Sequence, residues 1–276
     1  MPRSRDSRKI PSFTPTSRHP QDAIGFSWGA KSSSNPSRCR WRSSGSARTT
    51  PRRESFVALH EVGGRLAASG EDVLFVARGA HLDALNKSGL KVLSALGDLH
   101  LPKVKTAADT RGLGPADVVM IAVKLWSTEE AAQAAKPLIG PNTVAVSFQN
   151  GVVAVDTLTQ TLGREHVMGG VANIAALIEA PGVIRHNGNM ATLLFGELDG
   201  KPSARSTAFH EACVRAKIKA ELVGDIQKAI WEKYVRLVTL SAMTSLTRMP
   251  VGPIRSDPDT RALLQAVMEE VIALGR

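Results

Sequence analysis

Three short apolar segments constrain the fold of this chain more than any other feature, because each has the length of a buried strand and each ends in a polar residue. The segments are VLFVAR, which ends at Arg78, VVMIAVK, which ends at Lys124, and AVSFQN, which ends at Asn150. Nearly continuous apolar runs are typical of parallel strands that helices cover on both faces. Helical patterns separate the three segments, so the sequence predicts an α/β fold with a Rossmann-type doubly wound sheet.

The segments between these strands carry the start and stop signals of helices. We expect one helix over GGRLAASG, closed by Gly70, and another over GAHLDALNKSG, which ends at Gly89. In STEEAAQAAKPLI, Ser127 is expected as the N-cap and Glu130 stands at the capping-box position. Two short alternating stretches around Gly97 predict a hairpin.

The character of the sequence changes after the third strand segment. The stretch GVIRHNGNMATLLFGELDG alternates apolar and polar residues between glycine turns, which is typical of antiparallel strands. From Asp225 onward the pattern is helical. We therefore expect a tail over residues 1–54, a Rossmann-type domain over 55–222 that is incomplete at its start, and a truncated helical domain over 223–276.

The tail is built from Ser, Arg, Pro and Thr without apolar periodicity, so we expect it to be disordered. Residues 1–60 hold 12 Lys/Arg and 3 Asp/Glu, a net charge of +9, which leaves 23 against 22 for residues 61–276. The tail could be an organellar transit peptide, a phosphate-binding arm, or a segment that is not natural coding sequence. We favour the last interpretation, because the tail ends abruptly where a structural element should already be half built.

Cysteine usage and hydropathy indicate the setting of the protein. Cys39 and Cys213 lie far apart, and the sequence has no Cys/His cluster at metal-ligand spacing. This predicts a reducing, cytoplasmic environment and no structural metal. The longest apolar runs are the length of strands and fall short of the roughly 20 residues that a membrane-spanning helix needs, so no membrane partner is expected.

The polar residues that end the three strand segments are candidate site residues, because ligands of open α/β sheets bind beyond the carboxyl ends of the strands. An arginine at the end of the second strand accommodates the 2′-phosphate of NADP, whereas an acid there binds the ribose hydroxyl of NAD, so Arg78 favours NADPH. The alternatives are a solvated arginine at position 78, a surface lysine at 124 and an ordinary Asn-Gly turn at Asn150.

The helical region contains the best catalytic candidate. Lys233, Leu237 and Ser241 share one helix face and continue an apolar stripe that begins with Ile226 and Ile230. An ammonium on such a face can stabilise a developing alkoxide and supply its proton. The alternative is a lysine whose stem packs at the edge of the stripe while its ammonium reaches water.

Taken together, these segments resemble the ketopantoate reductases, or 2-dehydropantoate 2-reductases. The resemblance covers roughly residues 62–276 and rests on VLFVARGAHLDAL, VVMIAVKLWSTEEAA, VSFQNGV, GGVANIAALIEAPGVIRHNGNM and IWEKYVRLVTLSAMTSLTR. It implies an NADPH-binding Rossmann domain and a helical domain that binds substrate and can support a homodimer. The implied reaction reduces 2-dehydropantoate, a small 2-oxo acid, to pantoate on the route to pantothenate and coenzyme A.

The resemblance also implies roles for individual residues. Lys233 in WEK matches the catalytic lysine, which donates a proton or a hydrogen bond to the C2 oxygen of the substrate. Arg78 and Lys124 match basic residues that meet the adenosine 2′-phosphate, and Asn150 matches the asparagine between cofactor and substrate. Ala175 falls where a main-chain group contacts the cofactor, and a substrate-contacting side chain stands at the position of Ser241.

The chain departs from the family pattern at three places. Leu237 stands where some members have a substrate-binding asparagine, and Glu269 and Glu270 do not replace the serine and glutamate of later family helices. The family has a strand and a GxGxxG loop directly ahead of GGRLAASG, where this chain has TTPRRESFVALHE, and Gly63 and Gly64 lie too late to serve. We interpret this as a frame error or wrong start upstream of about Val62, with an interrupted downstream end, and expect little turnover without the loop.

Two other functions are compatible with the sequence. One is a related NADPH-dependent reductase that acts on a different 2-oxo acid or on an imine. The other is a nucleic-acid-binding protein that uses its basic tail, because residues 1–60 carry nearly all of the excess positive charge.

Overall fold

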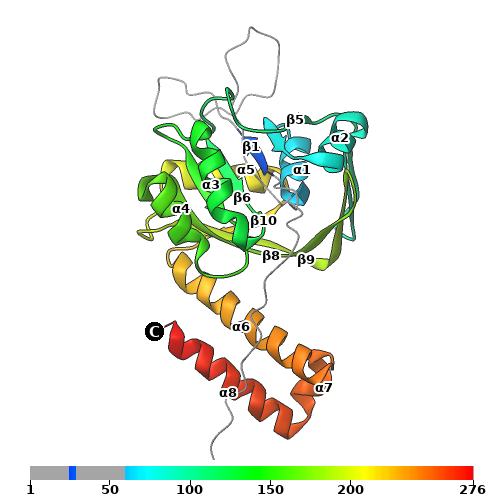
Figure 1. The fold of residues 1–276 in the computed structure, drawn as a ribbon, viewed down its shortest axis with the longest axis vertical. Coiled ribbons are helices and arrows are strands. Elements are labelled where there is room, and N and C mark those ends of the chain that lie inside the picture. The colour runs from blue at the N-terminus through cyan, green and yellow to red at the C-terminus, as the bar shows by residue number, and fades with distance from the viewer. Residues whose placement is uncertain (1–24, 29–59, 276) are drawn as a thin grey trace, which may run out of the picture.

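The structure is a computed structural model that describes Gly25–Trp28 and residues 60–275. Its centre is a ten-stranded mixed sheet with the order β4-β3-β9-β8-β7-β6-β1-β2-β5, and β10 pairs with β9 (Figure 1). The strands are β1 (Gly25–Trp28), β2 (Val73–Val76), β3 (Leu90–Ser94), β4 (Leu99–Leu101), β5 (Lys105–Ala107), β6 (Val118–Ile121), β7 (Val144–Ser147), β8 (Val167–Ala180), β9 (Val183–Glu197) and β10 (Lys219–Leu222).

The strand directions match the two expected patterns. Strands β6, β7 and β8 pair in parallel, as do β2 and β5. The predicted hairpin around Gly97 is present as the antiparallel pair β3 and β4, and β8 and β9 form a long antiparallel pair. The prediction of an α/β fold with a Rossmann-type sheet is therefore confirmed.

Strand β1 is the part of the sheet that the sequence did not predict. It lies between β2 and β6 and is antiparallel to both, so four residues of the expected tail occupy the place of the missing first strand. The expectation that residues 1–54 are disordered and take no part in the fold is thus not met at Gly25–Trp28. The rest of that expectation falls on residues outside the described ranges.

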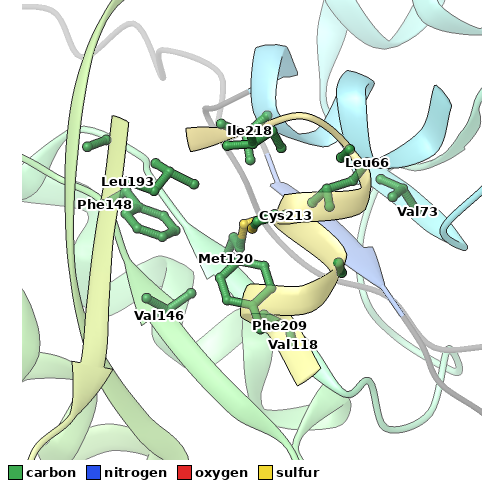
Figure 2. Packing of buried hydrophobic residues seen from close by; sticks show 14 of the residues in the cluster. Leu66, Val73, Val118, Met120, Val146, Phe148, Leu193, Phe209, Cys213 and Ile218 are labelled. Atoms are coloured by element: carbon green, nitrogen blue, oxygen red, sulfur yellow. The ribbon is translucent and has the colours of Figure 1, made fainter. Parts of the chain in front are cut away.

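Helices cover both faces of the sheet. They are α1 (His60–Ala68), α2 (Gly79–Ser88), α3 (Thr128–Ala135), α4 (Ala154–Leu162) and α5 (Ala204–Arg215). Successive residues of a strand point to opposite faces, so Val118 packs with α1 and α5 while Val119 packs with α3 and α4. Figure 2 shows the first of these cores, where Phe209 and Cys213 of α5 lie among strand residues such as Met120.

The C-terminal region is helical, as expected. It consists of α6 (Ile226–Thr247), α7 (Val251–Ser256) and α8 (Pro258–Leu274). Figure 1 shows α6 leaving the sheet beneath β8 and β9, with α8 returning alongside it. The Asp225 side chain caps α6 by accepting a hydrogen bond from the Lys228 backbone N–H at 2.9 Å. The boundary that we expect between residues 222 and 223 falls in the link from β10 to α6 and stays a prediction.

The capping box expected at α3 is wrong. Ser127 is the N-cap residue, but its side chain makes no capping hydrogen bond, because a short 3-10 helix, Leu125–Ser127, precedes α3 and holds it in a non-extended conformation. The Thr128 hydroxyl donates to the Leu125 carbonyl at 2.7 Å. Glu130 pairs with Arg78 instead, at 3.2 Å, and so links α3 to the end of β2.

Candidate functional site

Helix α6 approaches the sheet at a patch without side chains. Gly169 of β8 and Gly196 of β9 are cross-strand partners. A Cβ atom on Gly169 would lie 2.7 Å from Ile226 Cγ1 and 3.3 Å from Ile230 Cδ1, and one on Gly196 would lie 2.2 Å from the Val223 carbonyl oxygen. Only glycine permits this approach at either position. The two glycines therefore place the first turns of α6 directly on the sheet.

Lys233 follows one turn later and is held against β8. Its Nζ donates a hydrogen bond to the Ala172 carbonyl oxygen at 2.6 Å. Burial lowers the pKa of the Lys233 ammonium to about 8, and the charge of Arg236 adds to this effect. The side chain is half-buried and hydrogen-bonded, so it does not extend into water as the snorkelling alternative requires. A lysine with such a pKa can give up its proton near neutral pH.

The three predicted residues lie at the same edge of the sheet, the one formed by the carboxyl ends of the parallel strands. Strands β6 and β7 pair in parallel, with Ile121 opposite Ser147, so Lys124 and Asn150 emerge at the same end. Strand β1 is antiparallel to both β2 and β6, which gives β2 the direction of β6 and brings Arg78 to that end as well. All three residues are exposed. The edge thus carries two cations and an amide within reach of a bound ligand.

Gln149 connects the loops behind this edge and was not predicted from the sequence. Its Nε2 donates to the Val123 carbonyl oxygen at 2.7 Å, and its Oε1 accepts from the Ser147 hydroxyl at 2.9 Å. A further contact joins Gln149 to Thr128, at 2.9 Å from Nε2. Gln149 therefore fixes the loop that bears Lys124 relative to the loop that bears Asn150. The signal for it was a polar residue directly after a buried strand.

A small depression separates this edge from α6. Its volume is about 10 Å³, the space of roughly one water molecule, and its lining comes from β7, the β7–α4 loop, α4, β8 and α6, among them Gln149, Gly151, Gly170 and Ile230. Ile230 lies one turn before Lys233, so the depression joins the edge that bears Asn150 to the helix that bears the lysine.

Ala175 and Ser241 lie apart from the centre of the site. The pairing of β8 with β9 shifts register between Ile174 and Ala176, so Ala175 stands at a β-bulge and its backbone leaves the regular ladder. This suits a main-chain contact to a ligand. Ser241 is exposed on α6, eight residues after Lys233, or about 12 Å along the helix axis. The structure does not bring Ser241 together with Lys233.

The described residues suit the adenosine 2′-phosphate of NADP better than its pyrophosphate. Arg78 and Lys124 suit a phosphate at the carboxyl edge. The first turn of α1 is different, because His60 and Glu61 are buried there. The His60 ring stacks on Phe75 with centroids 5.3 Å apart, and Glu61 accepts a hydrogen bond from Arg65 Nε at 2.5 Å. A pyrophosphate needs bare backbone N–H groups at this helix start, and these side chains do not supply them.

Within the described residues, no helix is long and apolar enough to cross a membrane.

The chain matches known proteins over most of the described residues. Residues 61–200 match the family model described as ketopantoate reductase PanE/ApbA, and residues 225–276 match its C-terminal counterpart. A 2-dehydropantoate 2-reductase from Mesorhizobium japonicum is 34% identical over 233 residues, which cover 76% of this chain and 71% of that protein. The uncharacterised oxidoreductase YkpB of Bacillus subtilis is 32% identical over 78% of this chain and 70% of its own length.

Solved structures agree with this assignment. The crystal structure of 2-dehydropantoate 2-reductase from Geobacter metallireducens superposes with a TM-score of 0.72 at 30% identity, over 78% of this chain and 71% of that chain. The family is one of NAD(P)-dependent oxidoreductases. On sequence and structure alike, the chain belongs to the ketopantoate reductase PanE/ApbA family.

Proposed function

We propose that this chain descends from, and carries the site of, an NADPH-dependent reductase that converts 2-dehydropantoate to pantoate. The observation that carries the proposal is Lys233, whose half-buried ammonium is held on the Ala172 carbonyl at the junction of the sheet and the helical region. Family membership and relatives that bear this activity in their names support it.

Lys233 supplies the proton of the reaction. The ketone at C2 gains a hydride on its carbon, the carbonyl π bond breaks, and the oxygen becomes an alkoxide that takes a proton from the Lys233 ammonium. NADPH, when bound, supplies the hydride. The neutral amine left on Lys233 recovers its proton from water, which a pKa near 8 makes easy at neutral pH.

The edge of the sheet holds the cofactor in this proposal. Arg78 and Lys124 bind the adenosine 2′-phosphate, which requires Arg78 to exchange Glu130 for the phosphate. Asn150 lies between cofactor and substrate, and the backbone of Ala175 at its bulge contacts the cofactor. Ser241, about 12 Å from Lys233 along α6, has no assigned role in this proposal beyond the substrate contact that the family resemblance implies.

The pH dependence of turnover follows from the pKa of Lys233. The acid is present below about pH 8 and is lost as the pH rises through that value, so kcat for reduction should fall above about pH 8. A lysine in water would keep its proton to roughly pH 10. The measurement is a pH–rate profile in the reduction direction, and a rate that is constant from pH 7 to pH 10 contradicts the role of Lys233.

Cofactor preference tests Arg78. In a version of the chain with a GxGxxG loop placed ahead of Val62, Arg78→Ala should weaken NADPH binding by roughly tenfold or more and leave NADH binding nearly unchanged, because only NADPH carries the 2′-phosphate. Arg111→Ala is a matched control, since Arg111 is exposed and, among the described residues, forms its ion pair with the nearby Asp109. Equal losses for both cofactors would remove Arg78 from phosphate binding.

Substrate identity is tested with a panel of 2-oxo acids. The loop-bearing version is assayed with NADPH against 2-dehydropantoate, pyruvate, phenylpyruvate and a cyclic imine. We expect the highest kcat/KM for 2-dehydropantoate. A higher value for another 2-oxo acid, or for the imine, would assign the site to a related reductase.

A further inference from the structure

A second cation lies beside Lys233. Arg236 follows it by three residues on α6, which places the two side chains on adjoining parts of one helix face. Arg236 Nη2 donates to Asn173 Oδ1 at 3.1 Å, while Lys233 Nζ donates to the carbonyl oxygen of Ala172. The two cations therefore bond to successive residues of β8.

Within the part of the chain that the structure describes, no ion pair balances the charge of these two residues. Among the ion pairs of the described residues, none involves Lys233 or Arg236, and the oxygens that accept from them are neutral. Other arginines are paired, such as Arg205 with Glu197 at 2.8 Å and Arg185 with Glu179 at 2.5 Å. Two neighbouring like charges without a counter-ion disfavour each other, and an anionic ligand would relieve this.

The chemistry of the neighbouring position points to the same ligand. Leu237, next to Arg236, offers no hydrogen bond to a substrate, so this helix face needs another group to bind a charged substrate. The Arg236 guanidinium is exposed, and its planar fork matches a carboxylate. In a 2-oxo acid the carboxylate is one bond away from the carbonyl carbon, so residues one helical turn apart can serve both groups.

We propose that Arg236 binds the carboxylate of the 2-oxo acid substrate while Lys233 donates its proton to the adjacent carbonyl oxygen. This inference rests on the proposed function. Arg236 is then a determinant of substrate class. The site accepts free 2-oxo acids and discriminates against their esters, in which the charge is absent.

The test uses the full chain and needs neither cofactor nor turnover. Pyruvate or methyl pyruvate is added at pH 7.5 with cyanoborohydride. The neutral Lys233 amine condenses with the ketone and loses water, and hydride from the reagent converts the imine to a secondary amine that mass spectrometry locates. We expect pyruvate to label Lys233 about tenfold faster than the ester, after correction for their labelling of a free lysine derivative.

Arg236→Leu should bring this corrected acid-to-ester ratio close to one, and Arg236→Lys should restore part of it. The ratio is the readout because loss of Arg236 also changes the pKa of Lys233, which affects both reagents alike. Arg261→Leu, which removes an exposed arginine of α8, is the control and should keep the wild-type ratio. Circular dichroism confirms that each variant folds.

Two results overturn the inference and separate it from the proposed function. If Lys233 is labelled faster than the exposed Lys201 but with a ratio of one in the wild-type chain, or with an unchanged ratio in Arg236→Leu, then Arg236 does not bind the carboxylate and the reactive lysine stands. If Lys233 is labelled no faster than Lys201, the lysine site itself fails, and the inference fails with it.

Discussion

Replacement of Lys233 by alanine is expected to lower kcat for the reduction of 2-dehydropantoate by roughly 100-fold or more, the scale of general acid catalysis. The variant loses the ammonium that is held on the Ala172 carbonyl, and with it the proton source for the C2 oxygen. Cofactor affinity should stay nearly unchanged, because the residues proposed to bind the cofactor lie at the sheet edge. The measurement is kcat and the Kd of NADPH in the version that carries a GxGxxG loop ahead of Val62.

Lys228→Ala is the matched control for this experiment. Lys228 lies on the same helix, is exposed, and pairs with Glu232 at 3.8 Å, so its removal should leave kcat within about twofold. A kcat for Lys233→Ala that equals that of the control would remove the lysine from the mechanism and leave only family membership behind the proposed function.

The second large effect is expected at the glycine patch beneath α6. Gly196→Ala places a Cβ 2.2 Å from the Val223 carbonyl oxygen, a backbone atom that cannot rotate away. The link from β10 to α6 must therefore shift. We expect the free energy of unfolding to fall by about 2–3 kcal/mol, in the upper part of the range for overpacked cores, and kcat to fall as well because Lys233 moves with the helix. Urea denaturation measures the first quantity.

Gly252→Ala is the comparison. A Cβ on Gly252 would meet no atom within 4 Å, so the substitution should leave stability unchanged or raise it slightly through the better helix propensity of alanine. Equal unfolding midpoints for the Gly196 and Gly252 variants would show that α6 does not depend on close approach to the sheet.

The sequence was sufficient to predict the layers of the fold because the signals are local. Buried strands β2, β6 and β7 lie in nearly continuous apolar runs, and the polar residue that was expected to face a ligand follows the end of each strand by two or three residues. The sequence could not predict β1, because a four-residue strand in a polar, basic segment has no period to detect, and its antiparallel pairing depends on a gap in the sheet.

The parts of the site that were missed depend on contacts between distant residues. Ser127 and Glu130 fit a capping box by spacing, but the 3-10 turn leaves the Ser127 side chain without a capping hydrogen bond, and Glu130 pairs with Arg78, 52 residues away. Gln149 and Arg236 were missed for the same reason, since their roles come from partners on other elements. Lys233 was found because a charged residue interrupts an apolar stripe, which is a local signal.

Transfer of the hydride from NADPH to C2 is the most direct test of the proposed function. NADPH deuterated at the transferable position of C4 is incubated with 2-dehydropantoate and one of two proteins. One is the 276-residue chain without a glycine-rich loop, and the other is the version that carries a GxGxxG loop ahead of Val62. We expect pantoate with one deuterium at C2 from the loop-bearing version, and a loss of most of this product in its Lys233→Ala variant. Absence of deuterated pantoate from both preparations, with each shown to be folded and the loop-bearing one to bind NADPH, would contradict the proposed function.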